Sequence, residues 1–80
     1  MARRMPMRIR WYNPALGAFE WRVAPETDEE AMTLMEEAPE PRICVDAYWK
    51  WRNLGATVVA SFVRAGEAAR DASCPGDEGG

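Results

Sequence analysis

Two stretches near the N-terminus alternate between apolar and polar residues. The apolar positions are Met7, Ile9 and Trp11 in the first stretch and Phe19, Trp21 and Val23 in the second. Side chains of a strand alternate between two faces, so this period predicts two half-buried β-strands. Between them, residues 13–17 read Asn-Pro-Ala-Leu-Gly. Asn bonds nearby backbone, Pro presets φ and Gly tolerates the left-handed region, so this segment predicts the turn of a β-hairpin.

The length of the turn decides which residues of the hairpin lie opposite each other. A five-residue turn over residues 13–17 sets these pairs: Tyr12 with Ala18, Trp11 with Phe19, Arg10 with Glu20 and Ile9 with Trp21. In this register the apolar faces of the two strands coincide, and a shift of one residue would separate them. The outward face then carries Arg8, Arg10, Tyr12 and Arg22.

Helical spacing of apolar residues begins after the hairpin. Thr27 and Glu30 have the form of a capping box, and acidic residues fill the first turn, so a first helix is predicted from Thr27 to Ala38. Pro41 suits the first turn of a second helix, which ends at Gly55. The buried stripe of the second helix is predicted to be Cys44, Ala47, Tyr48, Trp51 and Leu54.

The β-branched run over residues 57–63 is compatible with a helix or with a buried strand. We predict a third helix, capped by Thr57 and ending near Asp71. Its inward side chains are Val59, Phe62, Val63, Gly66 and Ala69. The predicted fold class is α+β, an N-terminal antiparallel hairpin packed on two or three helices. The expected contacts join Trp11, Phe19 and Trp21 of the hairpin to Leu34, Trp51 and Phe62 of the helices.

The 80 residues predict one small domain over residues 1–72, with a flexible basic arm at 1–6 and a disordered tail at 73–80. Met1 and Met7 are both candidate natural starts. No apolar run approaches the roughly 20 residues that cross a bilayer, so we expect no membrane contact. Cys44 and Cys74 match no metal-ligand spacing or disulfide framework and are expected as reduced thiols in a cytoplasmic protein.

The ionisable residues limit the catalytic and metal-binding sites that the chain can form. The chain has no histidine, which excludes triads that use an imidazole base. Cys44 is predicted on a buried helix face, where a thiol is usually inert. Consecutive carboxylates of the first helix diverge around its axis rather than converge on a cation. We therefore expect no enzyme activity, cofactor or metal site.

The net charge of −3 is unevenly distributed. Residues 1–23 carry five arginines and one glutamate, whereas residues 24–80 carry five cations and twelve carboxylates. Such asymmetry either marks a surface for an anionic partner or is neutralised within the fold.

Two surfaces are candidates for binding. Trp49 and Val45 lie off the buried stripe of the second helix, next to Lys50 and Arg52. Aromatic residues and arginine anchor protein interfaces, so this patch predicts a protein partner or self-association, and hence a regulatory module, adaptor or inhibitor. The alternative for this patch is that the hairpin covers the second helix. The second candidate surface predicts an accessory nucleic-acid binder that uses Arg8, Arg10, Tyr12 and Arg22.

Overall fold

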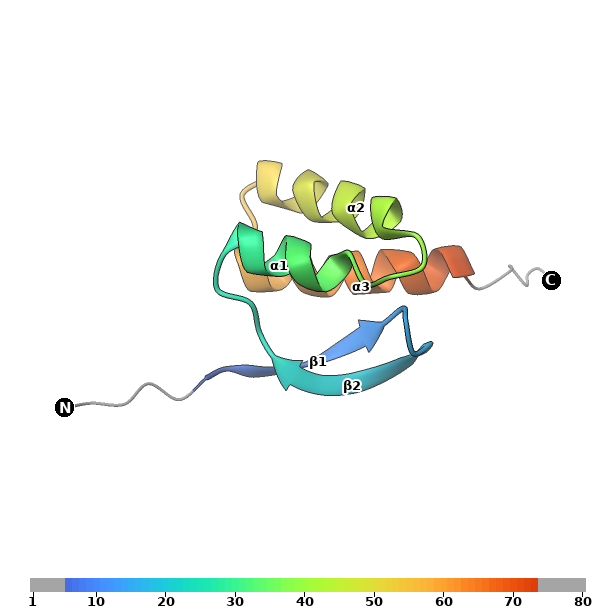
Figure 1. The fold of residues 1–80 in the computed structure, drawn as a ribbon. Helices are drawn as coiled ribbons and strands as arrows, with labels where there is room; N and C mark the ends of the chain where they lie inside the picture. The colour runs from blue at the N-terminus through green and yellow to red at the C-terminus, as the bar shows by residue number, and fades with distance from the viewer. Residues whose placement is uncertain (1–5, 74–80) are drawn as a thin grey trace.

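The computed structural model describes residues 6–73 and contains a β-hairpin below three helices (Figure 1). The elements are β1 (Arg8–Asn13), β2 (Ala18–Val23), α1 (Asp28–Met35), α2 (Pro41–Asn53) and α3 (Val58–Ser73). The predicted α+β class is confirmed, and the β-branched run 57–63 opens a helix rather than a strand. The predictions of a basic arm and a disordered tail concern residues 1–6 and 73–80, which lie almost entirely outside the described residues.

Local signals set the helix ends. The Thr27 hydroxyl caps α1 by accepting from the Glu30 amide at 3.1 Å. The Glu30 carboxylate accepts from the amide of Glu26 at 2.7 Å, one residue earlier than a capping box predicts. Pro41 opens α2, and Gly55 takes the left-handed conformation, with φ of 103°, just beyond its end. These signals place the starts of α1 and α2 where the sequence predicts them, whereas α1 ends at Met35, before the predicted Ala38.

The turn of the hairpin is one residue shorter than predicted. Asn13, the last residue of β1, pairs with Ala18, the first residue of β2, which leaves residues 14–17 as the turn. The Asn13 carbonyl accepts from the amides of Leu16 and Gly17, and its side-chain oxygen accepts from the amide of Ala15 at 2.9 Å. Asn13 therefore closes the turn from within the strand, and the predicted register is wrong by one residue.

This shift turns each side chain of β2 to the opposite face of the hairpin from the one predicted. Trp11 lies opposite Glu20, and Ile9 lies opposite Arg22. Residues directly opposite share a face, so Glu20 and Arg22 point to the helix side with the buried Trp11. The prediction that Arg22 lies outward with Arg8, Arg10 and Tyr12 is therefore wrong. The expected packing of Phe19 and Trp21 against the helices is also wrong, because both lie on the outer face.

A hydrogen-bonded cluster holds the polar residues on the inner face. The Asn13 side-chain amide donates to the Glu20 carboxylate at 2.9 Å. Arg22 donates to the same carboxylate oxygen at 3.1 Å and lies over the Trp11 ring, 5.6 Å from its centroid. The observed register therefore gives the inward polar groups partners.

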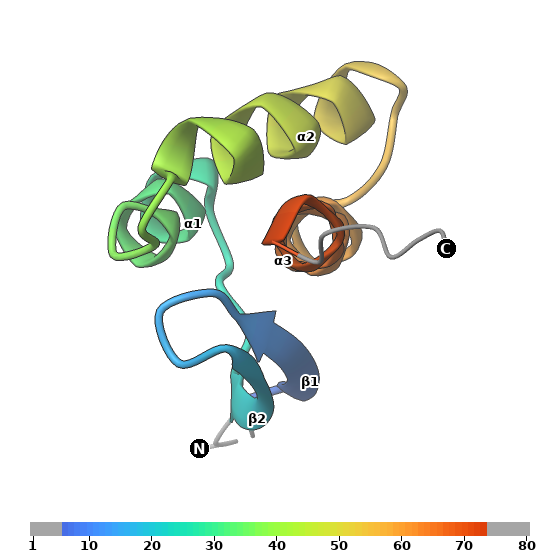
Figure 2. The same cartoon turned by 90° about the vertical axis from the view of Figure 1, so that its right-hand side faces the viewer.

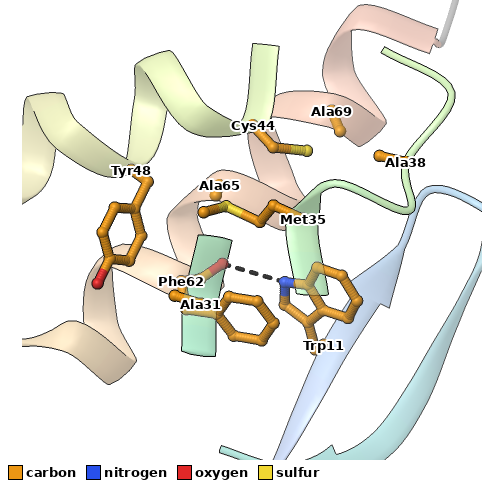
Figure 3. Packing of buried hydrophobic residues seen from close by; sticks show 9 residues of the cluster. All are labelled: Trp11, Ala31, Met35, Ala38, Cys44, Tyr48, Phe62, Ala65 and Ala69. Carbon is orange, nitrogen blue, oxygen red and sulfur yellow. Dashed lines mark hydrogen bonds between the residues drawn. The ribbon is translucent and has the colours of Figure 1, made fainter. Parts of the chain in front are cut away.

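The core lies between α1, α2, α3 and β1 (Figure 3). Trp11 stacks on Phe62 with ring centroids 4.4 Å apart, and its indole N–H donates to the Phe62 carbonyl at 3.0 Å. Met35 and Cys44 fill the space between the helices, and both are fully buried. The expected contact between Trp11 and Phe62 is therefore confirmed.

Two other residues expected in the core lie at its margin. Leu34 is partly buried and packs against the core. Trp51 is half-buried, with the guanidinium of Arg64 4.9 Å from its ring centroid. At the end of α2, Leu54 is exposed, so the predicted stripe is buried at Cys44 and Tyr48 and opens toward the end of the helix.

The elements form layers, with α2 above α1 and α3, and the hairpin below them (Figure 2). Both ribbon views place β1 between α3 and β2. The backbone of β1 lies against α3, whereas the backbone of β2 neighbours β1 and no helix. Over residues 6–73, no helix combines the length and apolar character needed to cross a membrane.

Candidate functional site

The outer side of the hairpin presents two arginines and a tyrosine from β1 beside three apolar side chains from β2. We call it the hairpin face, and it comprises Arg8, Arg10, Tyr12, Phe19, Trp21 and Val23. Tyr12 lies opposite Phe19, Arg10 opposite Trp21, and Arg8 opposite Val23. The exposed fractions are 69% for Trp21, 50% for Val23 and 37% for Phe19. The largest aromatic side chain on this face is therefore mostly open to solvent.

Contacts within the hairpin face hold its centre in place. The Arg10 guanidinium lies 4.2 Å from the centroid of the Phe19 ring, and Arg70 of α3 lies 5.6 Å from it. Tyr12 meets Phe19 edge-on, with centroids 5.3 Å apart and an interplanar angle of 79°. Cations at such distances are attracted to the ring face. Phe19 is thus fixed by neighbours, whereas Trp21 has most of its surface free for a partner.

The charge of the hairpin face is positive. Its two guanidinium groups, on Arg8 and Arg10, share the face with no carboxylate. Glu20 is the carboxylate of β2, and it points to the inner face, where Arg22 and Asn13 bind it. The register therefore separates an inner, internally neutralised set of polar groups from an outer, cationic one.

Sequence reasoning missed Phe19, Trp21 and Val23 as surface residues. Alternation within β2 fixes that these three share a face, but the turn decides which face of the hairpin it is. Asn13 carries the signal that could have found them. Four-residue and five-residue turns are both frequent hairpin connections, and a four-residue turn leaves Asn13 in the strand.

The predicted patch on α2 is only partly open. Trp49 is half-exposed and packs edge-on against Tyr48, with ring centroids 5.2 Å apart, and Lys50 is exposed. Val45 packs against the core, and Arg52 bonds within the fold. The hairpin lies on the other side of the molecule and does not cover α2 (Figure 2). The role of Trp49, Lys50, Arg52 and Val45 in binding a partner stays a prediction.

A hydrogen-bonded network ties α1 to α2. Asp28, the first residue of α1, accepts from the Tyr48 hydroxyl at 2.5 Å and from the Arg52 Nε at 2.9 Å. Arg52 also donates to the Ala56 carbonyl at 2.9 Å, in the connection between α2 and α3. The hydrogen bond from Arg52, followed by that from Tyr48, lowers the pKa of Asp28. Desolvation, together with the Asp28 carboxylate, raises the pKa of Tyr48, so its hydroxyl stays a proton donor.

This network is satisfied from within the fold. The Asp28 carboxylate has two donors, and the Arg52 guanidinium has a carboxylate and a carbonyl. It positions the start of α1 and the turn after α2. We call these hydrogen bonds of Asp28, Tyr48 and Arg52 the clamp, and its role is structural.

Cys44 is fully buried in the core, and burial raises the pKa of its thiol. A raised pKa keeps a thiol protonated and unreactive. Among residues 6–73, no group of three or more Cys, Asp or Glu side chains is placed to hold a metal ion.

A shallow groove opens beside the end of β2. It has a volume of about 320 Å³ and separates Val23 and Pro25 from Thr33 and Leu34 of α1. Its lining is mostly apolar, so it adjoins the hairpin face as a second apolar surface.

Comparison with known proteins adds no relative: no family model, curated protein or solved structure matches this chain.

Proposed function

We propose that this chain is a non-enzymatic protein interaction module and that the hairpin face is its contact surface. The observation that carries the proposal is the position of Trp21, exposed at 69% in the middle of a strand and opposite Arg10. Tryptophan, tyrosine and arginine dominate the binding energy of protein interfaces, and their cost of exposure is offset when a partner covers them. The hairpin face brings all three residue types together.

The shape and rigidity of the surface support the same function. The inner side of β1 is anchored through Trp11 to Phe62, so the hairpin is held against the helices. A surface built on a fixed strand loses little conformational entropy when it binds. The positive charge of Arg8 and Arg10 favours a partner whose contact surface is apolar with an acidic rim.

Site-specific photo-crosslinking in cells tests the proposal. A benzophenone side chain is placed at position 21, and a matched control carries it at position 54, because Leu54 is exposed at the same 69% but lies at the end of α2. We expect protein adducts of defined mass from position 21 and not from position 54. Equal adduct patterns at the two positions would contradict a binding role for the hairpin face.

A second function, binding of single-stranded nucleic acid, is favoured by one observation. Arg8 and Arg10 flank exposed aromatic rings on a face that has no carboxylate. Aromatic side chains stack on bases, and arginines contact phosphates. Arg22 takes no part in this version of the surface, because it points inward.

The nucleic-acid function is separated from the first by salt and by nuclease. It predicts that the adducts at position 21 disappear after nuclease treatment. It also predicts binding of a single-stranded oligonucleotide that weakens with salt and is lost in Arg8→Glu plus Arg10→Glu. Adducts that resist nuclease, with no titratable binding of the oligonucleotide, leave the protein interaction module as the function.

A further inference from the structure

One edge of β2 is open. The sheet has two strands, and within residues 6–73 the backbone of β2 neighbours that of β1 alone. The far edge of β1, in contrast, is covered by α3: a Cβ atom built on Gly66 would lie 2.8 Å from the carbonyl oxygen of Tyr12. An uncovered strand edge presents unpaired N–H and C=O groups, which are a template for another strand.

The hydrogen-bond pattern identifies which groups of β2 face the open edge. The amide of Ala24 donates to the carbonyl of Met7 at 2.8 Å, which makes these two residues a hydrogen-bonded pair. Such pairs alternate along an antiparallel ladder, so the backbone groups of Arg22 and Glu20 also point toward β1. Those of Phe19, Trp21 and Val23 point away from it. The three residues with exposed side chains thus also have outward backbone groups.

We propose that a second copy of this chain occupies the open edge. The two β2 strands pair antiparallel around a two-fold axis at Trp21, which joins the two hairpins into one four-stranded sheet. This inference rests on the proposed function, since it names a partner that pairs with the strand of Trp21 and brings the Trp21 side chains of the two copies next to each other. A two-fold interface uses the same surface on both copies, as a chain that binds itself requires.

Cross-strand pairing selects this register. With the axis at Trp21, Phe19 of each copy lies opposite Val23 of the other, and Glu20 lies opposite Arg22. Apolar and opposite-charge pairs of this kind stabilise a sheet. With the axis at Glu20 the two carboxylates oppose each other, and with the axis at Arg22 the two guanidinium groups do. An axis between two residues puts outward residues opposite inward ones. An axis at Phe19 or Val23 leaves fewer residues of β2 paired.

The same register brings the exposed side chain of Leu16 next to the apolar groove between β2 and α1 of the other copy. The turn of the second copy, residues 14–17, reaches the end of β2 beside Pro25. Leu16, exposed at 66% at the tip of that turn, then lies next to the apolar groove between β2 and α1. The groove also leaves the Val23 end of the strand accessible to an incoming chain.

Charge complementation tests the pairing. Glu20→Arg and Arg22→Glu each place like charges opposite one another at two symmetric positions, so we expect each variant to self-associate about tenfold more weakly than the wild type. In a mixture of the two variants every such position pairs opposite charges, and we expect dimerisation to recover. Light scattering across a concentration series reports all three, with Leu54→Ala, an exposed position at the end of α2, as a control that leaves the dimer intact.

A cysteine placed on the axis tests the register without relying on the charge variants folding. In a background with Cys74→Ser, Trp21→Cys puts two thiols on residues whose Cα atoms lie about 5.5 Å apart in the dimer, within reach of a disulfide. Phe19→Cys is the matched control, because the Cα atoms of the two copies of position 19 lie about 14 Å apart. Mild oxidation should crosslink the first variant and not the second, and circular dichroism checks that both are folded.

Three results overturn the inference: a wild type that is monomeric at all concentrations, a dimer unaffected by the charge variants, or crosslinking at position 19 in place of position 21. They are distinct from failure of the proposed function. A monomeric wild type whose position 21 still crosslinks to another protein retains the interaction module and loses the second copy as partner. A monomeric wild type that also gives no adducts at position 21 contradicts both the interaction module and the second copy as partner.

Discussion

Gly66 of α3 and Trp11 of β1 lie so close that no side chain fits between them. A Cβ atom on Gly66 would be 2.5 Å from the Trp11 Nε1 and 2.9 Å from its Cδ1. The missing side chain lets β1 approach α3 closely enough for the Trp11 indole to reach the Phe62 carbonyl. Helical periodicity predicts Gly66 on the inner stripe of the third helix, and this contact is the reason why a glycine occupies that position.

We predict that Gly66→Ala destabilises the fold by about 1–3 kcal/mol, because Trp11 must move and its hydrogen bond to Phe62 lengthens. The gain in helix propensity of about 1 kcal/mol only partly offsets this cost. Urea unfolding followed by circular dichroism measures the change. Ala68→Gly, elsewhere on α3, is the control for propensity alone. A stabilised Gly66→Ala variant would show that β1 tolerates a wider spacing from α3.

The two tryptophans of the hairpin should respond oppositely to truncation. Trp11 is 1% exposed, and Trp11→Ala removes a stacked ring and a buried hydrogen bond, at a cost of about 3–5 kcal/mol. Trp21 is on the outer face, and Trp21→Ala should change the stability of the monomer by less than about 0.5 kcal/mol. Urea midpoints at low protein concentration compare the two. Similar losses for both variants would restore the register in which both rings face the helices.

The helices were predictable because their signals are local. Thr27, Pro41 and Gly55 act on residues within one turn of themselves, so their effects can be read from neighbouring positions. The register of the hairpin is different. The alternation of each strand is the same in both registers, and the choice rests on how Asn13 bonds across the turn and to Glu20.

The candidate site shows the same division. Trp49 was predicted to be off the buried stripe of α2 from periodicity alone, and it is half-exposed. The ion pair of Arg52 was not predictable from periodicity, because its carboxylate partner Asp28 is 24 residues away in the chain. Trp21 was assigned to the core because its face depends on the turn.

Acid should weaken the clamp between α1 and α2. Arg52 and Tyr48 lower the pKa of Asp28 in the folded chain below its unfolded value of about 4. The stabilisation is therefore complete above pH values near 4 and is lost as the pH falls through the lowered folded pKa. We predict that Asp28→Asn reduces stability at neutral pH and flattens its decline in acid.

Urea midpoints between pH 2.5 and 7 compare Asp28→Asn with the wild type. Glu29→Gln is the control, since it removes a carboxylate from the same helical turn without touching Tyr48 or Arg52. Parallel pH profiles for the wild type and Asp28→Asn would rule out the clamp as a source of acid sensitivity. At the alkaline end, the raised pKa of Tyr48 predicts a further loss of stability as the pH rises above the value of a free tyrosine.

Ser61 is a polar side chain whose removal should stabilise the fold, in contrast to Asp28. It is fully buried in α3, and its hydroxyl oxygen is the one buried side-chain polar atom of the described residues that has no hydrogen-bond partner. Burying a hydroxyl without a partner costs about 1–3 kcal/mol. Ser61→Ala removes that cost and replaces serine by a better helix former. We therefore predict that the free energy of unfolding rises by about 1 kcal/mol.

Thr57→Ala is the matched control for Ser61→Ala, because the Thr57 hydroxyl accepts from the Ala60 amide at 3.0 Å at the start of the same helix. Its loss should lower stability by about 1 kcal/mol. Thermal and urea unfolding of both variants should therefore shift in opposite directions. If both shift downward, the Ser61 hydroxyl is hydrogen-bonded in solution, and its burial then stabilises the packing of α3.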